Sequence, residues 1–351
     1  MNNLNYNSVH PNFKWNGISL DREKLLIAAH NLITKGNDSE KNTGEFLLEW
    51  FNENSFITAT SSGTTGVPKK ITIDKQAMVN SALATAEFFD LKAGNRVLNC
   101  LSTNYIAGKM MLVRSIILGY EMDFVTPSSN PLKDNKYNYD FVAMVPMQVQ
   151  NSISELYKVK KLIVGGAKIS ETLLNQLLEV PTQIYETYGM TETITHIAVK
   201  KIEEKSFSVL SNVTIAIDER GCLVIAAPRI SDTNIVTNDV VELLSESQFL
   251  LLGRIDNVIN SGGVKLFPEQ IEAKLSDKIK QRFFVIGIPD EKLGEQVLIV
   301  IEGKPAIFDD SVFENLPLYE KPKAIRFVPK FFETESGKVK RKDTLLLGSS
   351  K

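Results

Sequence analysis

A ten-residue segment rich in hydroxyl groups and glycine runs from Thr60 to Lys69, with the sequence TSSGTTGVPK. Backbone N–H groups, hydroxyls and a lysine ammonium all suit the oxygens of a phosphate. Gly63 and Gly66 would let the backbone approach such a ligand closely. The segment is not a Walker loop, because that pattern ends in Gly-Lys-Ser/Thr and here Pro68 precedes the lysine. It predicts a phosphate-binding loop, although an ordinary Ser/Thr/Gly turn would have a similar composition.

Five later segments carry residue types that suit a nucleotide and an acid. They are Gly165 to Ala167, YETYGMTET from Tyr185 to Thr193, TNDVVEL with Asp239, GRIDN with Arg254, and ESGKVKRKD around Lys338. A tyrosine ring can stack on a base, a glutamate is a hard oxygen ligand, and a carboxylate can accept from two hydroxyls. Each segment taken alone would more often be a structural turn or a solvated basic tail.

In this order, the segments resemble the signatures of the adenylate-forming superfamily of acyl-CoA synthetases, firefly-type luciferases and peptide-synthetase adenylation domains. The resemblance covers about residues 56–345. It implies that ATP converts a carboxylic acid to acyl-AMP and that a thiol then displaces AMP. The residues that it assigns to ATP and coenzyme A are Ser61, Ser62, Gly63, Thr64, Thr65, Gly66, Lys69, Gly165, Gly166, Ala167, Glu186, Thr187, Tyr188, Gly189, Asp239, Arg254, Gly262 and Gly263.

The resemblance also implies the catalytic groups and the cofactors, which are ATP, Mg²⁺ and coenzyme A as co-substrate. Lys338 would bind the α-phosphate region and the attacking carboxylate, where a cation stabilises developing negative charge. Thr191 would lie near the phosphates, and Glu192 would bind the magnesium ion. One departure from the family is Asn238, which stands where glycine usually precedes the aspartate.

The acid itself is indicated by weaker signals. The phosphate loop begins after fewer than sixty residues, which leads us to expect a shortened first subdomain. YIAGKMMLVR, YGMTETITHIA and GRIDNVINSGGVKLFPEQIE resemble a compact subgroup that acts on o-succinylbenzoate in menaquinone synthesis. That acid keeps an unreacted aromatic carboxylate, which needs a cation or several hydrogen-bond donors.

The candidate acid-binding residues are Tyr105, Lys109, Thr195 and His196. Lys109 is preferred to Arg114 because it directly follows Ile106 to Gly108, whereas Arg114 could cap a helix face. Three alternatives stay open: another aryl or acyl acid–CoA ligase, an enzyme that loads a carrier-protein thiol, and a non-catalytic nucleotide-binding relative. The last should have lost Lys338 or Glu192, and both are present.

Hydrophobic patterns along the chain predict the strands and helices that must position these residues. Strand-like runs alternate with helical patterns from Phe56, where FITAT is the first run, to about Tyr188, which predicts a parallel, helix-covered sheet. Asp74 and Ser170 suit helix N-caps. An antiparallel β element is expected from Ile197 to Leu252, around the turn DERG.

The expected fold class is therefore α/β and α+β. A large, shortened N-terminal adenylating domain would span residues 1–253, and a small mobile α+β C-terminal domain would span residues 254–351. In the family, the small domain rotates about a residue matching Asp256 after adenylation. That rotation brings SGGVKLFPE against the nucleotide, with Gly262 and Gly263 lining the thiol tunnel, where a side chain would obstruct it.

Composition excludes several classes of protein. The formal net charge is -2, with 40 basic and 42 acidic side chains, so no overall field favours nucleic acid or an anionic membrane. No segment approaches the ~20 apolar residues of a membrane span, and the start has no leader pattern. Cys100 and Cys222 lie in apolar runs and should be buried thiols. We expect a cytoplasmic protein with a small-molecule acid as partner; a homo-oligomer stays open.

Overall fold

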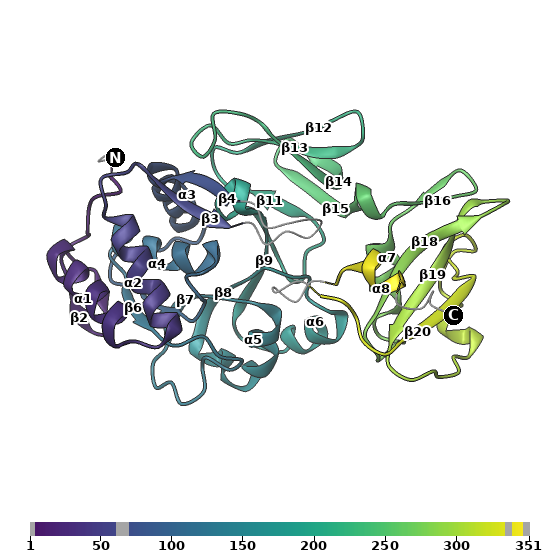
Figure 1. Ribbon diagram of the computed structural model, residues 1–351, viewed down its shortest axis with the longest axis horizontal. Helices are drawn as coiled ribbons and strands as arrows, with labels where there is room; N and C mark the ends of the chain where they lie inside the picture. Colours follow the sequence, from purple (N-terminus) through teal and green to yellow (C-terminus); the bar gives the residue numbers. More distant parts are fainter. Residues whose placement is uncertain (1–3, 61–69, 334–338, 347–351) are drawn as a thin grey trace.

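A thirteen-stranded sheet dominates the computed structural model, which describes residues 4–60, 70–333 and 339–346 (Figure 1). The strand order is β12-β13-β14-β15-β11-β10-β9-β8-β7-β5-β6-β1-β2. The strands are β1 (Lys14–Trp15), β2 (Ile18–Ser19), β5 (Arg96–Asn99), β6 (Glu121–Phe124), β7 (Tyr139–Met144), β8 (Val159–Val164), β9 (Gln183–Gly189), β10 (His196–Lys201), β11 (Phe207–Val209), β12 (Thr214–Ile217), β13 (Cys222–Ala226), β14 (Ile235–Ser245) and β15 (Gln248–Arg254).

The half of the sheet from β6 to β9 is parallel, and both of its faces are covered. Successive residues of a strand point to opposite faces, and here they enter different hydrophobic clusters: Phe141 packs in one and Val142 in the other. The covering helices are α3 (Lys75–Phe88), α4 (Ile106–Leu118), α5 (Pro146–Asn151) and α6 (Glu171–Leu177). The predicted parallel, helix-covered sheet is confirmed, with β10 to β15 continuing it in antiparallel fashion.

Local signals were reliable within this sheet. The Asp74 carboxylate accepts from Ala77 N–H at 2.8 Å and caps α3, and the Ser170 hydroxyl caps α6. The turn DERG joins β12 to β13 as an antiparallel hairpin. Both cysteines are buried free thiols. None of the described helices is long and apolar enough to cross a membrane.

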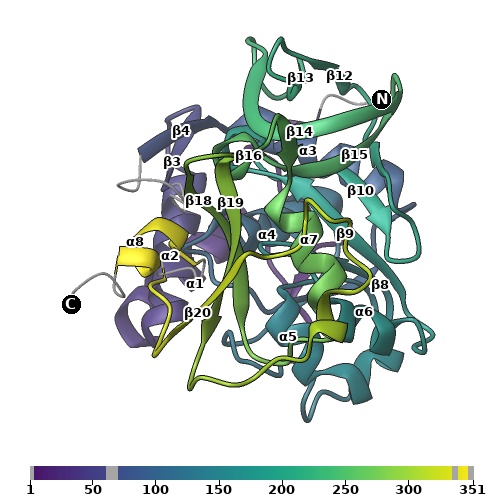
Figure 2. The ribbon, with the colours of Figure 1, turned by 90° about the vertical axis from the view of Figure 1, so that its right-hand side faces the viewer.

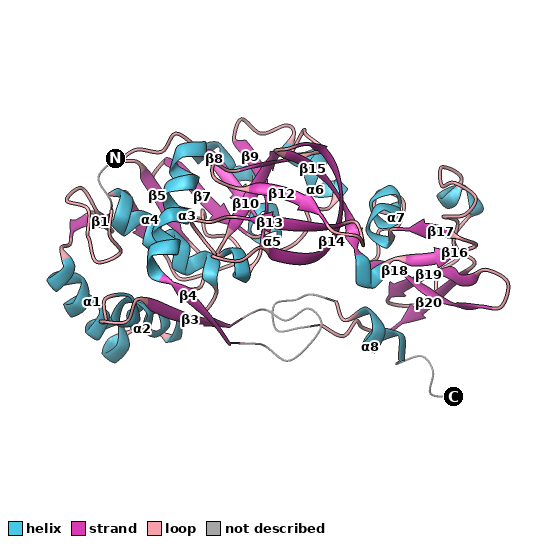
Figure 3. Ribbon diagram, turned by 90° about the horizontal axis from the view of Figure 1, so that it is seen from above, coloured by secondary structure: helices cyan, strands magenta, loops and turns pink. Residues whose placement is uncertain are grey.

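The expectation that FITAT belongs to the parallel sheet is wrong. Its strand, β3 (Phe56–Thr60), pairs only with β4 (Lys70–Asp74), in an antiparallel two-stranded sheet. Figure 3 shows this pair beside α2 (Asp38–Trp50), which follows α1 (Arg22–Lys35), and apart from the large sheet. The chain returns on itself within ten residues, so local antiparallel pairing replaces the long crossover that a parallel neighbour requires.

About the last quarter of the chain forms a separate five-stranded sheet, which faces the viewer in Figure 2. It contains β16 (Ile259–Ser261), β17 (Val264–Leu266), β18 (Phe283–Asp290), β19 (Gly294–Glu302) and β20 (Ala324–Val328), with helices α7 (Pro268–Leu275) and α8 (Arg341–Leu346). This sheet has two hydrophobic clusters of its own, one on each face. The expected α+β element is present. Its movement as a domain about Asp256 stays a prediction.

The short 3₁₀ helices are η1 (Ile153–Lys158), η2 (Thr191–Thr193), η3 (Ile255–Asn257) and η4 (Asp310–Phe313).

Arg341, in the segment ESGKVKRKD, is not part of a solvated basic tail. Its guanidinium donates to Glu272 Oε2 at 3.0 Å and to Val285 O at 2.8 Å. Burial raises the pKa of Glu272, which Arg341 opposes, so the ion pair attaches the start of α8 to α7 and β18.

Candidate nucleotide and acid site

Tyr188 and Asp239 are brought into contact from strands that are far apart in sequence. Tyr188 is the penultimate residue of β9, and its ring packs edge-on against Phe249 with 5.2 Å between ring centroids. Its hydroxyl donates to Asp239 Oδ2 at 2.6 Å. Burial and the adjacent carboxylate raise the pKa of Tyr188, so the hydroxyl remains a donor. Two of the predicted nucleotide residues thus form one buried unit.

Arg254 and Asp256 extend this unit to the predicted hinge. Asp239 of β14 lies opposite Arg254 of β15 in the antiparallel register, and Arg254 Nη1 donates to Asp239 Oδ1 at 3.1 Å. The other nitrogen, Nη2, donates to Asp256 Oδ2 at 3.2 Å. Asn238 Nδ2 donates to the same Asp256 oxygen at 3.2 Å. A carboxylate has about four acceptor positions, so Asp239 retains capacity for ribose hydroxyls.

The glycine turn after β8 lies next to the following strand. Gly166 has φ +84°, a conformation that side chains rarely adopt, and a Cβ on Gly165 would come within 2.5 Å of Thr187 Oγ1. Thr187 donates in turn to Val164 O at 3.1 Å. Glu186 is engaged otherwise, in a 2.6 Å ion pair with Lys200 on β10. The turn and β9 therefore form one continuous surface, on which Glu186 is already neutralised.

Glu192 and Thr191 lie on η2, directly after β9. The Glu192 side chain is exposed. A carboxylate oxygen in this position fits Mg²⁺, which is usually held by one or two carboxylates together with waters and substrate phosphates. Within the described part of the chain, no cluster of three or more His, Cys, Asp or Glu could hold a metal ion.

His196 and Thr195 belong to a buried polar cluster between α3, α4 and β10. His196 is 4% exposed, and its ring nitrogens lie 3.3 Å from the hydroxyls of Thr85 and Thr195. Burial, together with the Arg114 charge, lowers the pKa of His196 well below its ordinary value. The histidine is therefore neutral at physiological pH and can donate or accept through either ring nitrogen.

Arg114 of α4 is the buried cation of this cluster. It is 2% exposed, and its Nη2 donates to Thr195 Oγ1 at 3.4 Å. Burial lowers the pKa of Arg114 to about 10. No carboxylate of a described residue forms an ion pair with it, and its Nε and the neighbouring Tyr120 hydroxyl have no hydrogen-bond partner among the described residues. A buried guanidinium in such surroundings is costly unless an anion joins it.

Lys109 lies elsewhere, although it is on the same helix. It is 8% exposed, with its ammonium 3.9 Å from Glu49 Oε2 and 4.5 Å from the centre of the Phe46 ring. Burial lowers the pKa of Lys109, against the opposing effect of Glu49 and Glu45. These side chains line a polar pocket of about 350 Å³ beside β3. Lys109 thus has acidic neighbours, which Arg114 lacks in the part of the chain that the structure describes.

The remaining predicted residues are placed as follows. Tyr105 is the N-cap residue of α4 and is half exposed. Gly262 (φ +58°) and Gly263 (φ +84°) form the two-residue turn between β16 and β17, where Gly-Gly suits the backbone. A Cβ on Gly263 would meet no described atom within 4 Å, so backbone conformation rather than crowding requires this glycine. Ser61 to Lys69 and Lys338 lie outside the described residues.

The start of α7 lies next to the glycine turn. Lys168, which follows Gly165–Ala167 in the chain, donates through Nζ to Glu269 O at 3.3 Å. Gly189 also approaches the acid cluster, because a Cβ there would collide with Thr195 O. The glycine turn after β8, the end of β9 and the start of α7 therefore lie close together.

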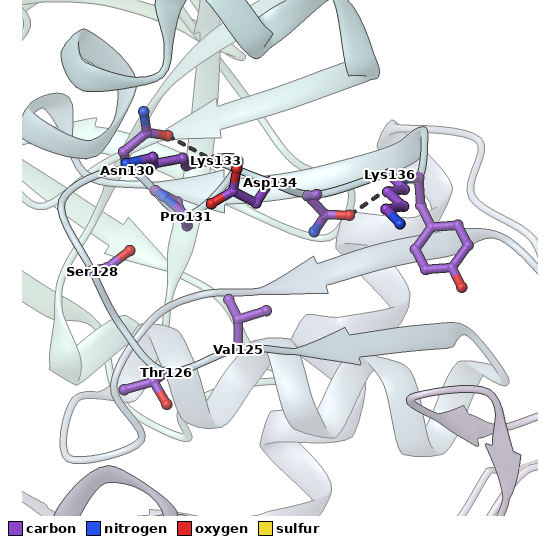
Figure 4. A pocket seen from close by; sticks show the side chains of 10 residues that line it. Val125, Thr126, Ser128, Asn130, Pro131, Lys133, Asp134 and Lys136 are labelled. Atoms are coloured by element: carbon purple, nitrogen blue, oxygen red, sulfur yellow. Dashed lines mark hydrogen bonds between the residues drawn. The ribbon is translucent and has the colours of Figure 1, made fainter.

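A larger hollow, of about 510 Å³, lies in the loop between β6 and β7 (Figure 4). It is lined by Val125, Thr126, Ser128, Asn130, Pro131, Lys133, Asp134, Asn135, Lys136 and Tyr137. None of the predicted site residues is among them, so volume alone does not locate the site.

Burial of His196 has a consequence that can be measured. The unfolded chain takes up a proton on this imidazole as pH falls below about 6.5, whereas the folded chain does not. The free energy of unfolding should therefore fall by up to about 1.4 kcal/mol per pH unit between pH 6.5 and 5. His196→Gln should flatten that slope in urea titrations, and His30→Gln is the control on an exposed histidine. Equal slopes in both variants would contradict the assignment.

The sequence of this chain matches a known protein family. The profile of the family described as AMP-binding enzyme matches residues 23–224. This chain belongs to the AMP-binding enzyme family.

Its relatives include ligases that act on 2-succinylbenzoate. The 2-succinylbenzoate–CoA ligase of Staphylococcus aureus (strain Newman) is 24% identical over 321 residues, covering 80% of this chain and 65% of the relative. The enzyme of that name from Haemophilus influenzae is 22% identical over 290 residues, covering 76% and 63%. This chain thus spans less than two thirds of the length of these relatives.

Two solved structures are also similar. The acyl-CoA synthetase (AMP-forming)/AMP-acid ligase II-like protein from Dyadobacter fermentans is 34% identical, with TM-score 0.60, covering 89% of this chain and 95% of that one. The o-succinylbenzoate CoA synthetase from Bacillus subtilis, in complex with an acyl-adenylate intermediate, is 21% identical, with TM-score 0.74, covering 84% and 69%. The second likeness concerns the fold alone.

Proposed function

We propose that this chain uses ATP to activate a carboxylic acid as acyl-AMP and then transfers the acyl group to coenzyme A. The observation that carries the proposal is the β9–β10 connection. It follows Tyr188, which contacts Asp239, and it ends at Thr195 and His196 beside a buried cation, with the exposed Glu192 between the two ends. One short segment thus links residues suited to a nucleotide with residues suited to an acid.

In the first half-reaction, a carboxylate oxygen of the acid bonds to the α-phosphorus of ATP and the bond to the β-phosphate oxygen breaks. Tyr188 would stack on the adenine, while Asp239 accepts from the ribose hydroxyls beside Arg254. Glu192 would hold Mg²⁺, which offsets phosphate charge when bound. The loop Ser61 to Lys69 would hold the leaving pyrophosphate, and Lys338 would face the reacting groups.

In the second half-reaction, the thiol sulfur attacks the acyl carbonyl carbon and AMP leaves. Residues 254–351 would rotate about Asp256 between the two steps, with residues 1–253 staying in place. The contacts of Asp256 with Arg254 and Asn238 support this position for the hinge, because a small backbone change there alters the unit that holds the ribose. A carrier-protein thiol is the alternative acceptor.

The buried Arg114 supports an acid with two carboxylates. One carboxylate reacts with ATP, and the second would neutralise the guanidinium, with Thr195 and the neutral His196 as further hydrogen-bonding groups. We therefore propose Arg114, rather than Lys109, as the cation of the acid pocket. The names of the Staphylococcus and Haemophilus relatives make o-succinylbenzoate, the acid of menaquinone synthesis, the first candidate.

A pyrophosphate-release assay with ATP and Mg²⁺ tests this proposal over a panel of acids. We expect o-succinylbenzoate to stimulate release more than benzoate, succinate, a fatty acid or an aromatic amino acid. Mass spectrometry should then detect o-succinylbenzoyl-CoA when coenzyme A is added. Release with another acid only would leave adenylation intact and overturn the choice of substrate, and release with none would overturn the activity.

A further inference from the structure

The connection between β9 and β10 contains a backbone conformation that β-branched residues rarely adopt. Ile194 has φ 66° and ψ -55°, and the N–H of Thr195 donates to Thr193 O at 2.7 Å. These values define a γ-turn of the rare, strained kind. Strain of this sort persists only where the surroundings over-determine it, and such sites cluster in functional regions.

The hydroxyl of Thr193 contacts backbone groups on both sides of it, at Met190 and at Thr195. Thr193 has no exposed surface, and its Oγ1 accepts from Met190 N–H at 2.9 Å. The same oxygen lies 2.7 Å from Thr195 O and 3.0 Å from Met190 O, so its single proton has a carbonyl acceptor on either side. The side chain therefore ties Met190, which precedes η2, to Thr195, which is the last residue of the turn.

Two further contacts hold the turn in place. The side chain of Ile194 is 3% exposed and packs in the main hydrophobic cluster, although its backbone conformation would suit glycine better. Gly189 lies so close that a Cβ there would collide with Thr195 O. The sequence thus keeps a large apolar side chain at a strained position, and the Thr193 hydroxyl is the polar group that holds it there.

The turn separates the two parts of the proposed site. Glu192 precedes it with an exposed carboxylate, while Thr195 and His196 follow it and contact Arg114 and Thr85. We propose that Thr193 is a positioning residue: its hydroxyl holds the Ile194 turn and thereby sets Glu192, at the phosphate end, relative to Thr195 and His196, at the acid end. This inference rests on the proposed function.

Three variants test it. Thr193→Val keeps the shape and removes the hydroxyl, Thr193→Ser keeps the hydroxyl, and Thr182→Val is the control. Thr182 is also buried and donates to Leu156 O at 2.6 Å, but it precedes the other end of β9. The melting temperature of each variant is compared with that of the unaltered chain by circular dichroism, so that a general loss of stability is measured separately.

The first readout does not need activity. Hydrogen exchange by mass spectrometry should show amides of peptides covering 190–197 exchanging at least about tenfold faster in Thr193→Val. The N–H of Met190 loses its hydroxyl acceptor, and the turn that holds the N–H groups of Ile194 and Thr195 against backbone carbonyls is loosened. Thr193→Ser and Thr182→Val should leave those peptides unchanged. The same protection in Thr193→Val as in the control would overturn the inference.

The second readout is the pyrophosphate-release half-reaction. Thr193→Val should lower kcat by about 100-fold, the usual effect of misplacing reacting groups by about 1 Å, and raise the Mg²⁺ concentration for half-maximal rate. The KM for ATP should change less, since Tyr188 and Asp239 are untouched. Thr193→Ser should restore the Mg²⁺ dependence. If Thr193→Val lowers kcat no more than Thr182→Val does, or if Thr193→Ser does not restore the Mg²⁺ dependence, the hydroxyl of Thr193 has a structural role only and the inference is overturned.

Failure of the inference and failure of the proposed function are distinguishable. If the unaltered chain releases no pyrophosphate with any acid, the function fails, and the hydrogen-exchange comparison overturns or supports the role of Thr193 in the turn. If Thr193→Val does not fold, Thr193→Cys, which keeps a weak donor, replaces it, and an unchanged Mg²⁺ dependence in that variant overturns the inference.

Discussion

Replacing Lys338 with alanine is expected to lower pyrophosphate release by about 100- to 1,000-fold, the usual effect of removing one group that stabilises charge in a transition state. Conversion of a supplied acyl-adenylate to the coenzyme A thioester should stay within a few-fold of the unaltered rate. The reason is that the proposed rotation about Asp256 removes this lysine from the nucleotide before the thiol attacks. Pyrophosphate exchange and thioester formation measure the two half-reactions separately.

Lys342→Ala is the matched control for this prediction. Lys342 is exposed and lies on α8, the helix that Arg341 attaches to α7, so its charge is removed without disturbing that ion pair. We expect both half-reactions to be unchanged in the control. An equal loss of the two half-reactions in Lys338→Ala would remove the distinction on which its assignment rests.

Arg114→Met is expected to lower kcat/KM for o-succinylbenzoate by roughly 30- to 4,000-fold, corresponding to about 2–5 kcal/mol for truncating one partner of a buried charge pair. The substitution removes the guanidinium group that would bind the second carboxylate of the acid. For 4-oxo-4-phenylbutyrate, which lacks the ring carboxylate, the same variant should lose little. Pyrophosphate release with the two acids, measured in the unaltered chain and in the variant, isolates this one interaction.

Lys109→Met distinguishes the two cations of α4. Because Lys109 already has Glu49 and Glu45 as neighbours, its removal should affect the two acids equally. A loss confined to o-succinylbenzoate in Lys109→Met, with none in Arg114→Met, would return the acid-binding role to the lysine. Thermal melting of both variants is needed, since leaving a buried charge unpaired is destabilising.

Much of the scaffold could be predicted because its signals are local. Asp74 and Ser170 cap their helices through side chains that bond backbone N–H groups three residues ahead, and the turn DERG joins two adjacent strands. The alternation of strands and helices likewise predicted the parallel sheet, since parallel strands are usually joined through a helix, as β5 and β6 are through α4, although a loop joins β6 to β7. FITAT was misplaced because its composition suits either kind of sheet, and only pairing decides between them.

The order of motifs determined that this chain belongs with enzymes that bind AMP, and it named Tyr188, Asp239 and Arg254 as a group. What the tertiary structure decided is which side chains meet. The hydrogen bond from Tyr188 to Asp239 spans 51 residues, and no periodicity along the chain encodes it. The same holds for Arg114, which the sequence left as a possible cap of a helix face: it is buried on a helix that is apolar on nearly every side, with no carboxylate beside it among the described residues. Electrostatic surroundings depend on neighbours in space, which for Arg114 and Lys109 come from different layers of the fold, and so two cations five residues apart on one helix have opposite environments.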